Sequence, residues 1–98
     1  MTLSERQRKH LRRLAHALHP LVMVGNAGLT DAVVAEMDRT LAVHELVKVS
    51  VRVGDREARD AALETLATRT ESELVQRIGH VGVFYRRSES AKIMIPDQ

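Results

Sequence analysis

Residues 21–30 read Leu21-Val22-Met23-Val24-Gly25-Asn26-Ala27-Gly28-Leu29-Thr30, and this stretch decides the fold. The four uncharged residues at 21–24 predict a buried strand, and the two glycines allow turns that side chains forbid. Thr30 is typical of a helix N-cap, because its hydroxyl can accept a hydrogen bond from a first-turn N–H group. The sequence therefore predicts a strand that leads through a glycine loop into a helix.

The loop has GxxG spacing, which is typical of a clamp on a nucleic-acid backbone. Without a Cβ atom at either glycine, a ribose-phosphate chain can approach closely and the N–H groups of the loop and the following helix can face its phosphates. The alternative is that the glycines only shape a tight connection. No Lys-Ser or Lys-Thr follows the second glycine, which argues against a nucleotide hydrolase. The candidate RNA-binding residues in the loop are Gly25, Asn26, Ala27 and Gly28.

Length and composition predict one compact domain over residues 1–98, since the chain has 98 residues of which 44% are hydrophobic. The absence of cysteine excludes disulfides and thiolate metal sites and favours a reducing, cytoplasmic location. The longest stretch without Asp, Glu, Lys or Arg, residues 14–30, contains histidines, a proline and two glycines. Such a stretch cannot span a bilayer, so we expect a soluble protein that does not act at a membrane.

Charge is unevenly distributed along the chain, although the net charge is only +2. Residues 1–28 carry +4, which leaves −2 for residues 29–98. This asymmetry predicts a local surface for a polyanion, and the alternative is an ordinary solvated helix face. The candidate RNA contacts in this part of the chain are Arg6, Lys9, Arg12 and Arg13.

The first helix is expected from about Glu5 until Pro20 stops it. Ser4 and Gln7 form the S-x-x-Q pattern of a capping box. Helical spacing predicts one face for the core and a basic face broadly opposite. The residues expected to face the core are Leu3, Leu11, Leu14 and Leu18.

A second helix is expected from Thr30 to about residues 43–44, followed by a strand over residues 46–53. In that strand, valines alternate with Lys48, Ser50 and Arg52, which is the period of a strand with one buried and one wet face. This pattern favours a sheet covered on one side only, and therefore two layers. Lys48 and Arg52 are further candidate RNA contacts.

A third helix is expected from an N-cap at Asp55 to about Thr70, and two antiparallel strands over residues 73–78 and 81–86. Gly79 and His80 suit the two-residue turn of a hairpin. The apolar residues at 92–95 are expected to pack back as an extended segment. Right-handed crossovers should bring the loops after the first two strands to the same edge of the sheet, where Arg56 and Arg52 could share an anion with the glycine loop.

One set of residues extends over nearly the whole chain: Leu3-Ser4, Gln7, Leu11, Ala15-His16, Pro20, residues 24–30, residues 44–49, Asp55-Arg56-Glu57, residues 75–79 and Tyr85-Arg86. This pattern resembles the CRM domain (chloroplast RNA splicing and ribosome maturation), in its small stand-alone bacterial YhbY-like form. The resemblance implies an α/β (α+β) two-layer fold with a mixed sheet in the order 1-2-4-3 and strand four antiparallel, like the C-terminal domain of bacterial translation initiation factor three. It also implies RNA binding through the GxxG loop and association with precursors of the large ribosomal subunit.

Two features depart from the family pattern. Glu71 follows Thr70 where many members have glycine, which puts the end of the third helix in doubt. Asn26 and Ala27 are neutral, so charge attraction at the loop must come from neighbouring residues such as the first-helix arginines. We therefore expect modest, salt-sensitive affinity.

Catalytic and cofactor functions find little support in the sequence. His16 and His19 have a possible metal spacing, but Pro20 intervenes and no third ligand is evident, so we expect neither metal nor cofactor. There is no nucleophile elbow and no evident acid pair, which favours a non-enzyme without a small-molecule substrate. Phe84 and Tyr85 are the only aromatic residues and are adjacent on a strand, so at most one ring can reach RNA from the sheet.

Two classes of function remain open on the sequence. The first is a monomeric RNA-binding protein that assists ribosome assembly on ribosomal RNA. The second is a protein-interaction domain whose basic helix binds an acidic partner.

Overall fold

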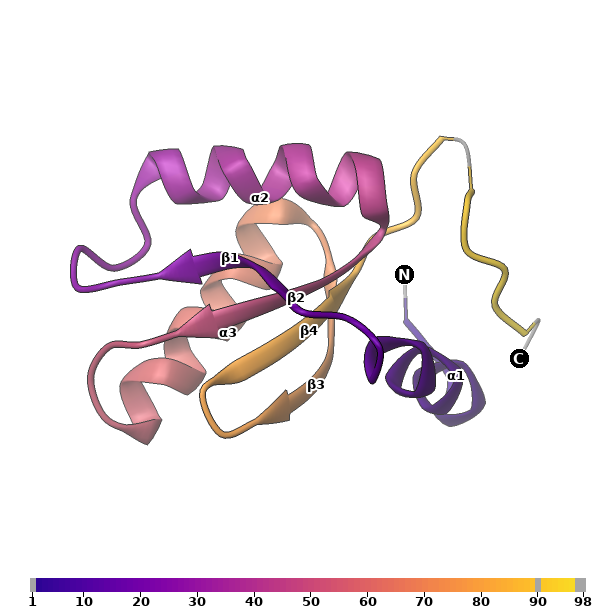
Figure 1. Cartoon of the computed structure of the whole chain (residues 1–98), viewed down its shortest axis with the longest axis horizontal. Helices are drawn as coiled ribbons and strands as arrows, with labels where there is room; N and C mark the ends of the chain where they lie inside the picture. The colour runs from indigo at the N-terminus through magenta and orange to yellow at the C-terminus, as the bar shows by residue number, and fades with distance from the viewer. Residues whose placement is uncertain (1, 90, 97–98) are drawn as a thin grey trace.

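The computed structural model describes residues 2–89 and 91–96, and the elements follow the expected order (Figure 1). The sheet has the order β1-β2-β4-β3, with β1 parallel to β2 and the other neighbours antiparallel. This arrangement confirms the predicted α+β fold with its mixed four-stranded sheet. The elements are α1 (Glu5–Ala15), β1 (Pro20–Val24), α2 (Asp31–His44), β2 (Leu46–Val51), α3 (Arg56–Thr70), β3 (Glu73–Ile78) and β4 (Val81–Tyr85).

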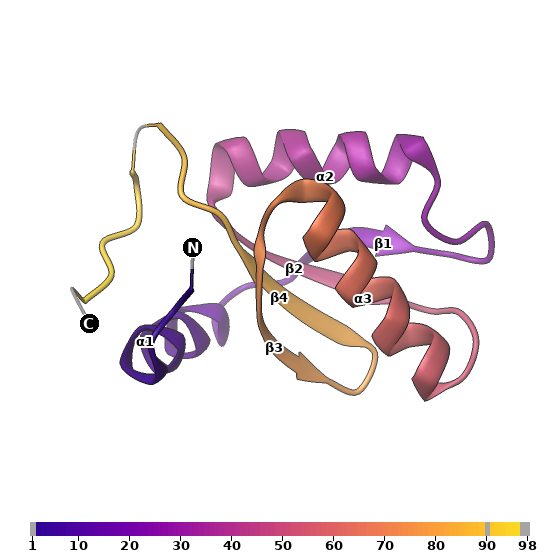
Figure 2. The same ribbon diagram turned by 180° about the vertical axis from the view of Figure 1, so that it is seen from behind.

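Helices α2 and α3 cover the first face of the sheet, and Figure 2 shows α3 in front of it. The alternating valines of β2 are buried there together with Phe84. These side chains pack against apolar residues of both helices. The helix residues are Val34, Met37, Leu41, Leu63 and Leu66.

The second face of the sheet is covered in part by α1, so the prediction of a sheet covered on one side only is wrong. Leu11 and Ala15 of α1 are buried against the sheet residues of this face. The alternation of residues in β2 did not reveal the contact with α1, because the apolar sheet residues that α1 contacts lie mainly on β3 and β4. The sheet residues of this second cluster are Leu46, Val75, Val83 and Tyr85.

The rest of the second face stays open, which corrects two expectations about buried residues. Leu21 and Met23 of the predicted buried strand are 52% and 59% exposed, whereas Val22 and Val24 are buried on the first face. Leu14 and Leu18 are also exposed, because α1 ends at Ala15 and touches only one end of the sheet.

Strand β2 ends two residues earlier than expected, and strand β4 ends one residue earlier.

The helix ends follow the predicted local chemistry. Ser4 and Gln7 form the capping box of α1, and the side chains of Thr30 and Asp55 accept hydrogen bonds from the third N–H groups of α2 and α3. Helix α3 ends at Thr70, and its C-cap residue Glu71 adopts the left-handed conformation with φ 53° although it is not glycine. Ser72 N–H then donates to Ala67 O, so the doubt about this helix end is resolved.

The C-terminal segment packs back onto the molecule, as predicted. Ile93 and Ile95 contact the cluster under α1, and Gln7 donates a hydrogen bond to Pro96 O. The main anchor is Glu45, which is fully buried between α2 and β2. Its carboxylate accepts hydrogen bonds from Ser88 and from Ile93 N–H, and the sequence analysis did not assign it this role.

Candidate nucleic-acid interface

The GxxG loop projects beyond the sheet at one end of the molecule, between β1 and α2 (Figure 1). Gly28 N–H donates to Gly25 O at 2.9 Å, and Thr30 N–H donates to Gly28 O at 3.0 Å. Gly28 has φ +75°, which explains glycine there by backbone conformation alone. Asn26 and Ala27 are exposed between the two glycines.

Gly25 has no comparable structural explanation. Its φ is not positive, and no atom of residues 2–89 and 91–96 lies within 4 Å of the position that a Cβ atom would occupy. Neither backbone strain nor packing within the chain therefore requires glycine at this position. The open space beside Gly25 is available to a molecule that approaches from outside.

Two arginines lie at the same end of the molecule as the loop. Arg52 N–H donates to Val24 O, which joins the end of β2 to the residue before Gly25. The parallel pairing of β1 with β2 also brings the β2–α3 connection, with Arg56 at its end, to this edge (Figure 1). The predicted proximity of the two loops is thus confirmed, and both arginines are exposed.

Helix α1, which carries the predicted basic residues, lies at the end of the molecule opposite the glycine loop (Figures 1 and 2). The prediction that the first-helix arginines neighbour the loop is therefore wrong. Their proximity in sequence is misleading, because the five residues of β1 run as an extended strand between them, a span of roughly 16 Å. Arg6, Lys9 and Arg13 are exposed and Arg12 is half-buried.

The open part of the second sheet face connects these two ends. Lys48 is half-buried on this face and lines a hollow together with Arg12. Further along β2, Ser50 and Arg52 line a second hollow with Met23. The candidate residues are thus spread between the first helix and the glycine loop as an extended track, and not one compact site, and of these Arg12, Lys48 and Arg52 line hollows on the open face.

Not every basic residue on the surface is available to a ligand. The Arg8 guanidinium contacts Glu73 at 3.1 Å and Leu74 O at 3.0 Å, which fixes α1 to β3. In contrast, no ion pair is formed within residues 2–89 and 91–96 by any cation of the track. These cations are Arg6, Lys9, Arg12, Arg13, Lys48, Arg52 and Arg56.

The sequence model of the CRS1/YhbY (CRM) domain matches residues 3–86. The chain belongs to this CRM domain family. An RNA-binding protein of Haemophilus influenzae is 46% identical over 95 residues, covering 97% of this chain and 96% of that protein. The probable RNA-binding protein YqeI of Bacillus subtilis is 36% identical and covers 96% and 99% of the two chains. The solution structure of protein SAV1595 from Staphylococcus aureus superimposes with a TM-score of 0.83 at 38% identity, covering 97% of this chain and all of that one.

The aromatic residues of this CRM domain belong to its core. Phe84 and Tyr85 point to opposite faces, as expected, but both are buried, by α3 and by α1 respectively. Burial, together with the Glu45 carboxylate, raises the pKa of Tyr85. Neither ring is available for stacking on RNA.

Two arginines near the candidate site were not selected from the sequence. Arg59 and Arg77 line a hollow with Arg56 beside the hairpin turn. Arg59 donates to Gly54 O at 3.2 Å, and its Nε is buried without a partner in the described structure. Its position three residues after Arg56 on α3 was a signal for a shared face.

No metal ligand set is evident in the part of the chain that the structure describes. No three His, Asp or Glu side chains gather there in a group that could hold an ion. Among the same residues, no helix is long and apolar enough to cross a bilayer. The expectation about metals is tested by a prediction below.

Proposed function

We propose that this CRM domain binds RNA through its sugar-phosphate backbone. The GxxG loop receives phosphates on its N–H groups, and the track of unpaired cations holds the strand along the open sheet face. Gly25 carries the proposal, since nothing within the chain requires glycine there while a phosphate backbone does require the space. The names of its relatives as RNA-binding proteins support the same conclusion.

The length of the track suits a strand of several nucleotides. The molecule measures 38 Å along its longest axis, with the loop at one end and α1 at the other (Figure 1). Affinity then comes from many phosphate contacts of modest strength, and it should fall steeply with salt. The relatives are named as RNA-binding proteins and not as enzymes, so we propose binding without catalysis.

The RNA that we propose is ribosomal RNA in precursors of the large subunit, bound in the cytoplasm by a monomer that assists assembly. The resemblance to the stand-alone bacterial form of the family supports this partner. Crosslinking of the protein to RNA in cells, followed by sequencing of the bound fragments, tests it. Enrichment of large-subunit precursor RNA is expected, and enrichment of unrelated RNAs would contradict it.

A protein-interaction domain is separated from this function by nuclease treatment. Co-sedimentation with ribosomal particles should be lost when the RNA of a cell extract is digested before the protein is added. If association survives complete digestion and a purified acidic protein accounts for it, the RNA-binding proposal is wrong.

A further inference from the structure

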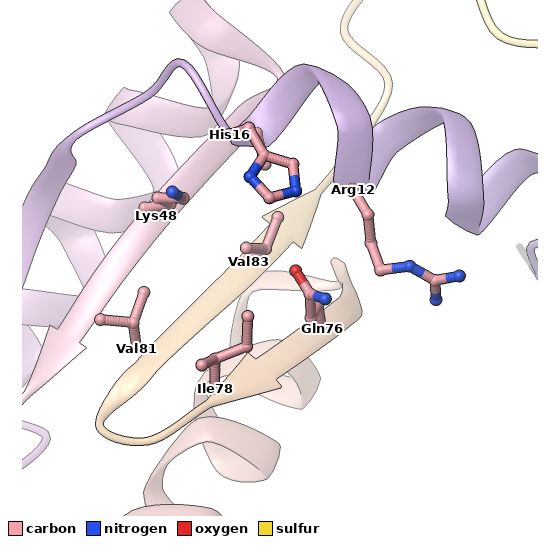
Figure 3. A pocket seen from close by; sticks show the side chains of 8 residues that line it. Arg12, His16, Lys48, Gln76, Ile78, Val81 and Val83 are labelled. Atoms are coloured by element: carbon pink, nitrogen blue, oxygen red, sulfur yellow. The ribbon is translucent and has the colours of Figure 1, made fainter.

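A hollow of about 200 Å³ lies between the C-terminal end of α1 and the open part of the second sheet face (Figure 3). Its floor is apolar and is formed by Val81 and Val83 of β4 and Ile78 of β3. Ile78 is 62% exposed, although it is a large apolar side chain. Val83 is buried towards α1 and Val81 is half-buried, so the exposed apolar part of the floor is formed by Ile78 and Val81.

The rim of the hollow is rich in nitrogen atoms, and none of the described residues that line it carries a carboxylate. His16 and Lys48 lie along one side and Gln76 along the other, with Arg12 further out (Figure 3). Arg12 and Lys48 form no ion pair with any residue that the structure describes. The rim can therefore attract an anionic ligand and also form directional hydrogen bonds.

The geometry points to one unpaired base of the bound RNA as the occupant of this hollow. Ligand pockets for drug-sized molecules measure roughly 300–1,000 Å³, so this hollow suits a single small planar group. A base has apolar faces for the valine and isoleucine floor and polar edges for the rim. This inference rests on the proposed function and adds a base contact to the backbone track.

Each rim residue has a separate role in holding a nucleotide. The Gln76 carboxamide carries both donors and an acceptor, so it can read the edge of a base. The His16 ring can stack on the base, since single-stranded bases pack on histidine as well as on larger aromatic rings. Lys48 and Arg12 are placed to hold the phosphates on either side. A base preference at one position should therefore be added to sequence-independent binding.

Binding of four fluorescent RNA decamers, each a homopolymer of one base, tests this inference by anisotropy. The wild-type protein should prefer one base by about tenfold, the range of one good side-chain contact to a base edge. Gln76→Leu should reduce the preference to within about twofold and leave the salt dependence unchanged. Val81→Trp should fill the hollow and lower the affinity for the preferred decamer to that of the others. Thr65→Trp, on the exposed surface of α3, is the matched control and should bind as wild type does.

The outcomes separate this inference from the proposed function. If wild-type protein binds ribosomal RNA fragments but shows no base preference, or if the preference survives both substitutions, the base pocket is wrong and backbone binding stands. If a nucleoside 5′-monophosphate binds as tightly as the preferred decamer, the hollow serves a free nucleotide and the strand assignment is overturned. If no RNA binds at all, both proposals fail. Thermal melts check folding, and Gln76→Leu keeps the test valid should the tryptophan in β4 disturb the sheet.

Discussion

The carboxylate of Glu45 accepts hydrogen bonds from both the N–H group and the hydroxyl of Ser88, 43 residues further along the chain. Burial by itself disfavours the charged form of this carboxylate. The Ser88 bonds, together with those from the N–H groups of Ile93 and Lys92, outweigh burial and lower its pKa from 4.5 to about 2. One ionised side chain thus fixes the path of the C-terminal segment over the core.

Glu45→Gln should destabilise the domain at pH 7 and release this segment. A carboxamide presents N–H donors where Ser88 and Ile93 already donate, so buried donors lose their acceptor, at a cost on the order of 2 kcal/mol. Urea denaturation measures the loss, and limited proteolysis after residue 86 reports the release. Glu36→Gln, on the exposed face of α2, is the matched control and should change neither the stability in urea nor the rate of proteolysis.

The hydrogen bonds between Glu45 and Ser88 also predict how the stability of the domain depends on pH. The folded pKa of Glu45 lies below the unfolded value, so its contribution is complete above about pH 5 and is lost as pH falls from 4.5 towards 2. Wild type should therefore lose more stability over this range than Glu45→Gln does. Parallel pH profiles for the two proteins would refute the assigned role.

Local sequence patterns predicted most of the fold, because helix caps and strand periods are short-range chemistry. Thr30 and Asp55 marked helix starts through side-chain acceptors a few residues from their donors. Leu14 and Leu21 were misjudged because their exposure depends on where α1 rests on the sheet. That placement follows from long-range contacts with β3 and β4, which no local pattern encodes.

The sequence proposed individual residues for the candidate site but not their arrangement in space. Lys48 and Arg52 emerged from strand alternation, and Arg56 from the crossover rule. The separation of Arg6 from the loop was missed, because charge asymmetry along a sequence does not give distance in space. Gln76 and His16 were noted for the family resemblance, and His16 also for a metal spacing, but no pattern predicted that they share a hollow, which exists only when β3 and α1 are brought together.

The basic face of α1 is expected to supply much of the affinity for RNA. Arg6 and Lys9 are exposed and three residues apart on one helix. Replacing both with Glu should weaken binding by tenfold or more, since each reversal replaces an attraction to phosphate by a repulsion. If the wild type neutralises about five phosphates, log affinity should fall against log salt with a slope of roughly −3 to −4.

A second double variant with the same change in net charge shows whether the position of the reversed charges matters for RNA binding. Arg39→Glu with Arg69→Glu places two reversals on α2 and α3, the helices of the first face. Arg69 pairs with Asp31 only at the surface, where an ion pair contributes little to stability. Equal losses of RNA affinity in both double variants would show that α1 has no special role. An affinity of the wild type that does not change with salt would contradict phosphate binding along the track.

Zinc should have no effect on the domain. His19 is exposed and His16 lines the hollow, and no third ligand joins them in the described structure. A metal that binds only the folded state raises its melting temperature, so unchanged melting with added zinc or chelator is expected. A rise of several degrees with stoichiometric zinc would contradict this prediction.

The two loop glycines should separate folding from binding. Gly25→Asp and Gly28→Asp each add a Cβ atom and a negative charge where phosphates and the α2 dipole should meet, so both should weaken RNA binding by tenfold or more. Only Gly28→Asp should also destabilise the fold, by about 1 kcal/mol, because its φ of +75° is strained for any side chain.

Filter binding to ribosomal RNA fragments and thermal melts, with Glu36→Gln as the control, measure these effects. Gly25→Asp is the sharper test, since nothing lies within 4 Å of the added Cβ atom and its folding should be unaffected. Loss of binding in a variant that melts like wild type can only arise from the ligand side of the loop. A Gly25→Asp protein that binds RNA as tightly as wild type would mean that residues 25–28 are merely a turn.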